Sequence, residues 1–338
     1  MMLSLPAELE AAIENVLREL PASQWVSAAQ SLSQRYRVEQ SSLKPAKRLA
    51  LATGRVAALG YLALILPATY AQLWGAMTAT KSRAPTWKPT TLLDIGSGPG
   101  TALWAATAIW PSLQNLTAWE REAAFLELGK QLAAASPSPV VAASKWEQIR
   151  LEGFLPRDAP HFDLIILGHV LNELDTSVQS KVISWAWEHC DGLLLLVEPG
   201  TSATFPFVKA ARQQLLALGA RTLAPRVHDQ MCPLVGDWCH FPQKVYRPEF
   251  QRRAKAAQAG WEESKFSYAA MARFGPDTKI WGRLLHQPHL HKAWADLIVS
   301  SQEGIVRERI LKRDKAAYQQ ARDYNWGDML DAPPSKDA

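Results

Sequence analysis

The sequence predicts a doubly wound α/β fold, in which helices cover both faces of a mostly parallel sheet. Between residues 91 and 219, short apolar runs alternate with amphipathic segments of helical period. The runs are apolar at consecutive positions, which is typical of strands buried on both faces. A glycine-rich turn follows the first run, and ligands of such folds bind at the carboxyl ends of the strands.

The elements follow in order along the chain. Residues 1–80 carry Leu, Ala and Val at helical spacing, and we expect an N-terminal helical region there. After a polar linker over 81–90, strands are expected at residues 91–95, 115–119, 139–143, 162–168 and 192–198. Helices are expected at residues 101–110, 121–136, 175–189 and 204–219. Residues 81–220 therefore form the predicted Rossmann-like domain.

The helical alternation stops at Arg221, and residues 221–330 are expected to be rich in β structure. Three β segments at residues 278–286, 292–300 and 304–312, separated by turn residues, predict a small antiparallel meander. Residues 331–338 are polar and contain two prolines, and we expect a disordered tail.

Composition narrows the class of protein. With 48% hydrophobic and 20% charged residues, the chain has the balance of a soluble globular protein. Three cysteines give no paired disulfide framework, which favours a reducing compartment. The N-terminus has neither a basic signal region nor an Arg-rich transit pattern, so a cytoplasmic location is expected. Residues 56–80 carry no charge, but Pro67 and Gln72 interrupt them, which favours buried helices over a membrane span.

The glycine-rich turn is the strongest chemical signal. In LLDIGSGPG, residues 92–100, a buried strand delivers Asp94 and then a loop containing Gly96, Ser97, Gly98 and Gly100 opens a helix. No Lys-Ser/Thr pair ends the loop, so it is not a Walker A loop. The pattern fits a loop that binds S-adenosylmethionine; the alternative is a structural turn without a ligand.

Acidic and polar residues end the following strands. Glu120 ends the second strand, where a carboxylate can accept both hydroxyls of a ribose. His169 and Asn172 follow the fourth strand, and Glu198 ends the fifth. His169 and Asn172 are the tentative catalytic residues, although each could equally be a capping or core residue. Neither a DPPY-type sequence nor a suitably placed cysteine nucleophile is present, so no catalytic signature of base methylation is evident.

The C-terminal third is basic. Between Phe241 and Asn325 lie 16 Lys and Arg but only 9 Asp and Glu, while the whole chain has a net charge of +5. This surplus indicates either a solvated face or a surface that contacts phosphates. The residues expected to contact RNA are Arg252, Arg253, Arg307, Arg309, Lys312 and Arg313.

Several motifs, taken in order, resemble a known family: the methyltransferase-like assembly factors of the mitochondrial ribosomal small subunit and their bacterial relatives. The resemblance runs through LPATY (66–70), LLDIGSGPG, GHVLNEL (168–174), LVEPGT (197–202), CPLVGDWCHF (232–241), KFSY (265–268) and WGD (326–328). It implies a class I methyltransferase fold, an adenosylmethionine site, and small-subunit ribosomal RNA in the ribosomal small subunit as partner. Neither DNA nor a membrane is expected as a partner.

The resemblance also implies four cysteines that hold an iron–sulfur cluster. Cys232 and Cys239 match the middle two, but Arg226 and a position near Ser300 stand where the first and last are expected. A four-thiolate cluster is therefore not expected. His228 and His240 could complete a two-Cys, two-His zinc set, although the spacing matches no trusted zinc pattern.

Three functions remain open from the sequence. The first is an adenosylmethionine-dependent factor that acts on or binds small-subunit rRNA during ribosome assembly. The second is a methyltransferase for a small molecule or a protein, without a ribosomal role. The third is a scaffold that binds the cofactor without turnover.

Overall fold

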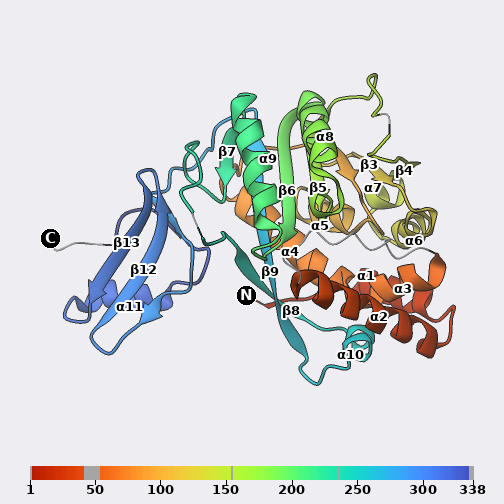
Figure 1. Ribbon diagram of the computed structural model, residues 1–338, viewed down its shortest axis with the longest axis horizontal. Helices are drawn as coiled ribbons and strands as arrows, with labels where there is room; N and C mark the ends of the chain where they lie inside the picture. The colour runs from red at the N-terminus through yellow and green to blue at the C-terminus, as the bar shows by residue number, and fades with distance from the viewer. Residues whose placement is uncertain (1, 42–53, 154, 235, 335–338) are drawn as a thin grey trace.

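Two β-sheets and their helices make up the part of the chain that the computed structural model describes, namely residues 2–41, 54–153, 155–234 and 236–334 (Figure 1). Figure 1 shows the large sheet at the centre, the first three helices against one end of it, and the small sheet on the opposite side.

The large sheet has nine strands. Eight follow the order β1-β8-β9-β6-β5-β2-β3-β4, and β7 pairs with β9 beside this path. Their bounds are β1 (Met2–Leu3), β2 (Thr91–Ile95), β3 (Asn115–Glu120), β4 (Lys145–Gln148), β5 (Phe162–Gly168), β6 (Cys190–Pro199), β7 (Arg221–Ala224), β8 (Phe241–Tyr246) and β9 (Trp261–Ala272). Strands β4, β3, β2, β5 and β6 are mutually parallel, while β9 is antiparallel to β6 and β8. This confirms the predicted doubly wound, mostly parallel sheet. Its strands come from residues on both sides of position 220.

Helices cover both faces of this sheet. Alternate residues of β6 face opposite sides of the sheet. Leu193, Leu195 and Val197 join the core under α4 (Leu66–Lys81) and α5, whereas Leu194 and Leu196 join the core under α8 and α9. The helix bounds are α5 (Thr101–Ile109), α6 (Ala123–Ala134), α8 (Thr176–Glu188) and α9 (Phe205–Ala217), and η1 (Leu171–Glu173) is a short 3₁₀ turn. The period of two along a doubly buried strand explains why the sequence shows an unbroken apolar run.

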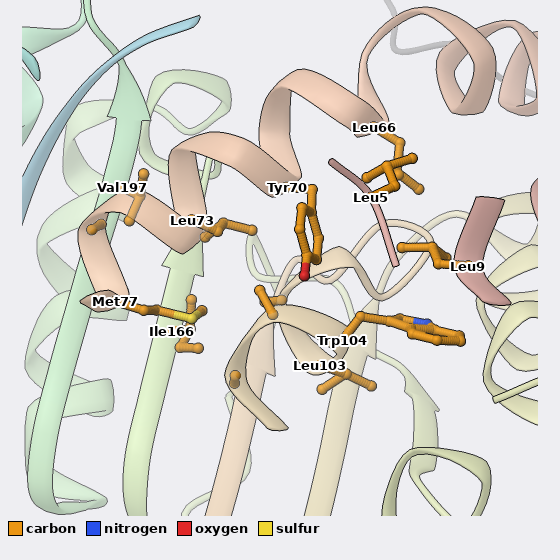
Figure 2. Close-up of a cluster of buried hydrophobic side chains, with 14 of the residues drawn as sticks. Leu5, Leu9, Leu66, Tyr70, Leu73, Met77, Leu103, Trp104, Ile166 and Val197 are labelled. Carbon is orange, nitrogen blue, oxygen red and sulfur yellow. The ribbon is translucent and has the colours of Figure 1, made fainter. Parts of the chain in front are cut away.

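The N-terminal region is helical, as predicted, within the described residues. Its helices are α1 (Ala7–Leu17), α2 (Ala22–Ser41), α3 (Arg55–Leu64) and α4 (Leu66–Lys81). In α4, Leu66, Tyr70, Leu73 and Met77 recur at helical spacing and are buried, and Figure 2 shows them over the sheet beside Ile166 and Val197.

The uncharged stretch over residues 56–80 falls on α3 and α4. No single helix in the described ranges is long and apolar enough to cross a membrane; α3 and α4 meet that test only as a pair bent by 54°. Ten residues of α4 are buried within the protein, so its apolar character is accounted for by packing against the sheet.

One predicted strand is wrong. Residues 139–143 form the short helix α7 (Pro139–Ala142), and the edge strand β4 follows it at Lys145–Gln148. Pro139 stands in the first turn of the helix, where its missing N–H costs nothing, and β4 is a mostly exposed edge strand that lacks an apolar run.

The small sheet is antiparallel, as predicted, and has the order β11-β12-β10-β14 with β13 paired to β12. The bounds are β10 (Gly282–Leu284), β11 (His289–Leu290), β12 (Trp294–Ser301), β13 (Gly304–Leu311) and β14 (Met329–Leu330). The region beyond Arg221 also contains two helices that the sequence did not indicate, α10 (Glu249–Lys255) and α11 (Lys315–Asp323). Of the predicted tail, residues 335–338 lie outside the described part.

Candidate functional site

The glycine loop joins β2 to α5 at the centre of the large sheet. Gly96, Gly98 and Gly100 have φ values of 69°, 53° and 80°, a left-handed conformation that favours glycine. The Ser97 N–H donates to the carbonyl of Trp119 at 2.9 Å, which ties the loop to the end of β3. The predicted loop residues therefore lie at the carboxyl edge of β2, beside β3.

Close packing leaves no room for side chains at two of these glycines. A Cβ on Gly96 would lie 2.5 Å from Cγ2 of Val170, and one on Gly100 would lie 2.7 Å from the ring of Trp146. A Cβ on Gly98 would meet nothing within 4 Å. The loop is thus enclosed at both ends and open at its centre.

Glu120 holds this loop in place. Its Oε2 accepts the N–H of Gly98 at 2.8 Å, and its Oε1 accepts the N–H of Glu122 at 2.8 Å. Burial raises the pKa of Glu120, while these backbone N–H donors oppose the shift. Each carboxylate oxygen has a second lone pair, so the side chain retains capacity to accept ribose hydroxyls.

Asp94 lies deeper, at 2% exposure. Its Oδ2 has no hydrogen-bond partner among the described residues. Burial, and secondarily the nearby Glu120 carboxylate, raise the pKa of Asp94 to about 8. A carboxyl group in this state can donate as well as accept a hydrogen bond near pH 7.

His169 and Asn172 lie at the carboxyl end of β5, as predicted. His169 has φ 63°, rare for a residue with a side chain, and its N–H donates to the Val197 carbonyl at 2.7 Å. Burial lowers the pKa of His169 to about 4, so the imidazole is neutral at pH 7 and a weak base. His169 Nε2 and Asn172 Oδ1 are both buried without partners in the described chain.

Glu198 completes the group at the end of β6. It is fully buried, and its Oε1 accepts the N–H of Leu171 at 2.7 Å, which positions the η1 turn. Burial, and less strongly Glu173, raise the pKa of Glu198 to about 8. Together, Asp94, Glu120, His169, Asn172 and Glu198 form what we call the crevice, along four adjacent strand ends.

Tyr61 is a crevice neighbour that the sequence did not indicate. It comes from α3, packs edge-to-face on Phe125 at 5.0 Å, and burial together with the carboxyl groups of Glu173, Glu120 and Asp94 raises its pKa. Its position depends on how the N-terminal helices dock, and no local motif carries that information.

Of the four positions where the resemblance implies cysteines, three are in contact through hydrogen bonds: Arg226, Cys232 and Ser300. Arg226, which is 3% exposed, donates from Nη1 to Ser300 Oγ at 3.1 Å and from Nη2 to Cys232 Sγ at 3.4 Å. Cys239 is buried, and burial raises the pKa of its thiol. The nearby Arg226 lowers this pKa and Cys232 raises it, both less strongly than burial does. A guanidinium has no lone pair for a metal and a serine hydroxyl is a poor iron ligand, so this donor set does not fit a four-thiolate cluster.

A second guanidinium lies beside the first. Arg212 donates from Nη2 to the His228 carbonyl at 2.6 Å and from Nη1 to the Gln230 carbonyl at 2.9 Å. Burial and the neighbouring Arg226 lower the pKa of Arg212. We call Arg212, Arg226, Cys232 and Ser300 the arginine centre.

The two histidines proposed to complete a zinc set have different surroundings. Burial and the two arginines lower the pKa of His228, and neither of its ring nitrogens has a partner in the described chain. His240 instead stacks on Trp238 at 5.1 Å and meets the Trp326 ring edge-on at 4.7 Å. Among the described residues, no three of His228, Cys232, Cys239 and His240 bring their ligand atoms within 4.8 Å of one another.

The cations expected to contact RNA fall into two groups. Arg252 and Arg253 on α10 both pair with Glu249, and Arg309 on β13 pairs with Asp296 at 2.8 Å. Arg307, Lys312 and Arg313 are exposed and make no ion pair with any residue in the described ranges. These three lie on or just after β13, the outer strand of the small sheet.

Comparisons with known proteins agree with this picture. A sequence model described as "Mitochondrial small ribosomal subunit Rsm22" matches residues 55–331. The human protein "Ribosome assembly protein METTL17, mitochondrial" is 30% identical over 296 residues, which cover 80% of this chain. The match spans 62% of the human protein's length.

Solved structures with a similar fold are more distant in sequence. A putative RNA methyltransferase from Pyrococcus horikoshii is 10% identical with a TM-score of 0.38, covering 61% of this chain and 81% of that one. Magnesium protoporphyrin IX methyltransferase from Synechocystis PCC 6803, solved with bound SAM, is 12% identical with a TM-score of 0.39, covering 61% and 80%.

Proposed function

Because the chain belongs to the mitochondrial small ribosomal subunit Rsm22 family, we propose that it is a ribosome assembly factor that binds S-adenosylmethionine in the crevice and small-subunit rRNA through the small sheet. The observation that carries the cofactor part is the glycine loop held by Glu120, with Gly98 N–H and Glu120 Oε2 2.8 Å apart.

The residues of the crevice fit the cofactor. Glu120 would accept the ribose hydroxyls, and the open face of Gly98 would admit the ligand close to the backbone. Asp94 Oδ2, Ser97 Oγ and Asn172 Oδ1 are buried polar atoms without partners in the described chain. When bound, the cofactor supplies an electrophilic methyl group on a sulfonium centre. This chain's contribution is to orient the cofactor and exclude water.

The RNA part rests on the unpaired cations of the small sheet. Arg307, Lys312 and Arg313 are exposed and form no ion pair within the described ranges, which favours their neutralising phosphates and releasing counterions. Arg252, Arg253 and Arg309 already pair with carboxylates, so we assign them a smaller contribution.

A direct test reverses the three unpaired charges. We expect Arg307→Glu/Lys312→Glu/Arg313→Glu to weaken binding of a small-subunit rRNA fragment by about 10-fold or more, with adenosylmethionine affinity unchanged in calorimetry. The matched control reverses three exposed cations of the large-sheet region, Lys130, Arg150 and Lys181. An equal loss of rRNA affinity in both variants would mean that only the net charge matters, and it would contradict the assignment of RNA binding to the small sheet.

Binding without turnover is a second candidate, favoured by one observation. Near pH 7 His169 is a weak base, and Asp94 and Glu198 are largely protonated, so none of these three residues is a strong general base. Thermal stabilisation by adenosylmethionine without methyl transfer to rRNA would support this form. Methyl transfer to a small or protein acceptor in RNase-treated extract would instead support a methyltransferase without a ribosomal role.

A further inference from the structure

A cluster of two histidines and one aspartate lies on the small sheet, far in sequence from the cysteines. His289 lies on β11 and His291 follows directly after this strand, and the two imidazole rings are in contact. Asp296 on β12 is directly opposite His289 in the antiparallel pair. The contact between the two rings and the register of the hairpin together bring three ligand side chains to one place.

The ligand atoms of this cluster are close. His289 Nδ1 lies 2.8 Å from His291 Nε2, and His291 Nε2 lies 3.1 Å from Asp296 Oδ2. All three atoms fall within 4.8 Å of one another, and no other group of His, Cys, Asp or Glu in the described ranges does so. In a tetrahedral zinc site with bonds of about 2.0–2.1 Å, ligand atoms are about 3.3 Å apart. Two of the three distances therefore lie within about 0.5 Å of that spacing, and the third is below 4.8 Å.

Surrounding groups hold the ligands in orientation. Trp294 Nε1 donates to Asp296 Oδ2 at 3.0 Å, and the Trp294 ring stacks on His291 at 4.6 Å. Arg309 donates to both oxygens of Asp296, at 2.8 and 3.2 Å. Such outer contacts fix the ligand rings and carboxylates at metal sites. The Arg309 cation also opposes metal binding, so affinity should be moderate.

We propose that His289, His291 and Asp296 form a binding site for zinc or a similar divalent transition metal, which clamps the β11–β12 hairpin. Two imidazoles and one carboxylate are ligands that zinc prefers, and they leave a fourth position for water. The metal replaces the hydrogen bond between the two imidazoles. The ion would secure β11, whose two paired residues are both exposed, and would weaken the hold of Asp296 on Arg309 beside the basic outer strand.

The test is a zinc titration of the full chain after chelator treatment, by competition with a chromogenic chelator. We expect one zinc per chain with a dissociation constant in the micromolar range. His289→Ala removes an exposed ligand at little structural cost and should weaken zinc binding at least about 10-fold, as should His291→Ala. The cobalt-loaded chain should show visible bands typical of tetrahedral coordination, and His289→Ala should lose them.

The matched control is His161→Ala, because His161 is also exposed and lies 2.8 Å from an aspartate, Asp191, on the large sheet. It should bind zinc like the unaltered chain. Two results would overturn the proposal: unchanged zinc affinity in both His289→Ala and His291→Ala, or loss of zinc binding in Cys232→Ser instead.

Discussion

The crevice and the arginine centre contain ionisable groups of opposite type, acidic in the first and basic in the second, in largely buried surroundings. The crevice gathers Asp94, Glu120 and Glu198, with backbone N–H groups as partners for Glu120 and Glu198. The arginine centre gathers Arg212 and Arg226, with carbonyl, hydroxyl and thiol partners. Burial raises the pKa of the three crevice acids and lowers the pKa of Arg212, which in each case favours the neutral form.

This difference separates a binding site from a structural contact. Among the described residues, the crevice leaves the acceptors Asp94 Oδ2 and Glu198 Oε2 unpaired, which gives it capacity for a ligand, whereas the arginine centre leaves one buried donor, Arg212 Nε. In the arginine centre, Arg226 donates hydrogen bonds from its two Nη atoms to Ser300 and Cys232. The bond to Ser300 joins the loop before β8 to the small sheet. We infer that the crevice serves binding and that the arginine centre serves cohesion.

The largest effect is expected from Gly96→Asp. The new side chain requires a left-handed backbone, meets Val170, and adds charge beside Asp94, so adenosylmethionine affinity should fall about 100-fold or more. Isothermal titration calorimetry measures it. Gly219→Asp is the control, since Gly219 also has positive φ but nothing within 4 Å. If Gly96→Asp bound adenosylmethionine as tightly as the unaltered chain does, the glycine loop would not be part of the cofactor site.

Arg226→Met tests cohesion at the arginine centre. It leaves the buried Ser300 and the half-buried Cys232 without their donor, so the free energy of unfolding should fall by about 2–4 kcal/mol, measured in urea. Adenosylmethionine affinity should be unchanged. The control Arg221→Met breaks an exposed pair with Asp229 and should cost at most about 1 kcal/mol. Equal costs in the two variants would contradict the structural role of Arg226.

The smallest effect concerns pH. The folded-state pKa of Glu198 is raised to about 8, so its contribution to stability is complete below its ordinary pKa near 4 and is lost as pH rises toward 8. In Glu198→Gln, the melting temperature should fall less between pH 5 and 8 than it does in the unaltered chain. Glu249→Gln is the control, because its pKa is lowered and its effect lies at acid pH. A slope unchanged by Glu198→Gln would remove Glu198 as the titrating group.

The sequence by itself determined the class of fold and most of the crevice. Apolar runs, glycine spacing and strand-terminal acids are local patterns, and parallel strands bring their carboxyl ends to one edge, so Asp94, Glu120, His169 and Glu198 were predictable as neighbours. The helix at Pro139–Ala142 was missed because an apolar run of that length fits a helix or a strand equally well.

Only the tertiary structure decided which cations are free and which donors meet. Arg252 and Arg253 pair with Glu249, and Arg309 pairs with Asp296. These pairs depend on the directions of the side chains, which a count of charges along the sequence does not give. The contact of Arg226 with Ser300 joins residues 74 positions apart, and Tyr61 reaches the crevice through helix docking. Such contacts depend on register and packing between distant segments, which local periodicity does not specify.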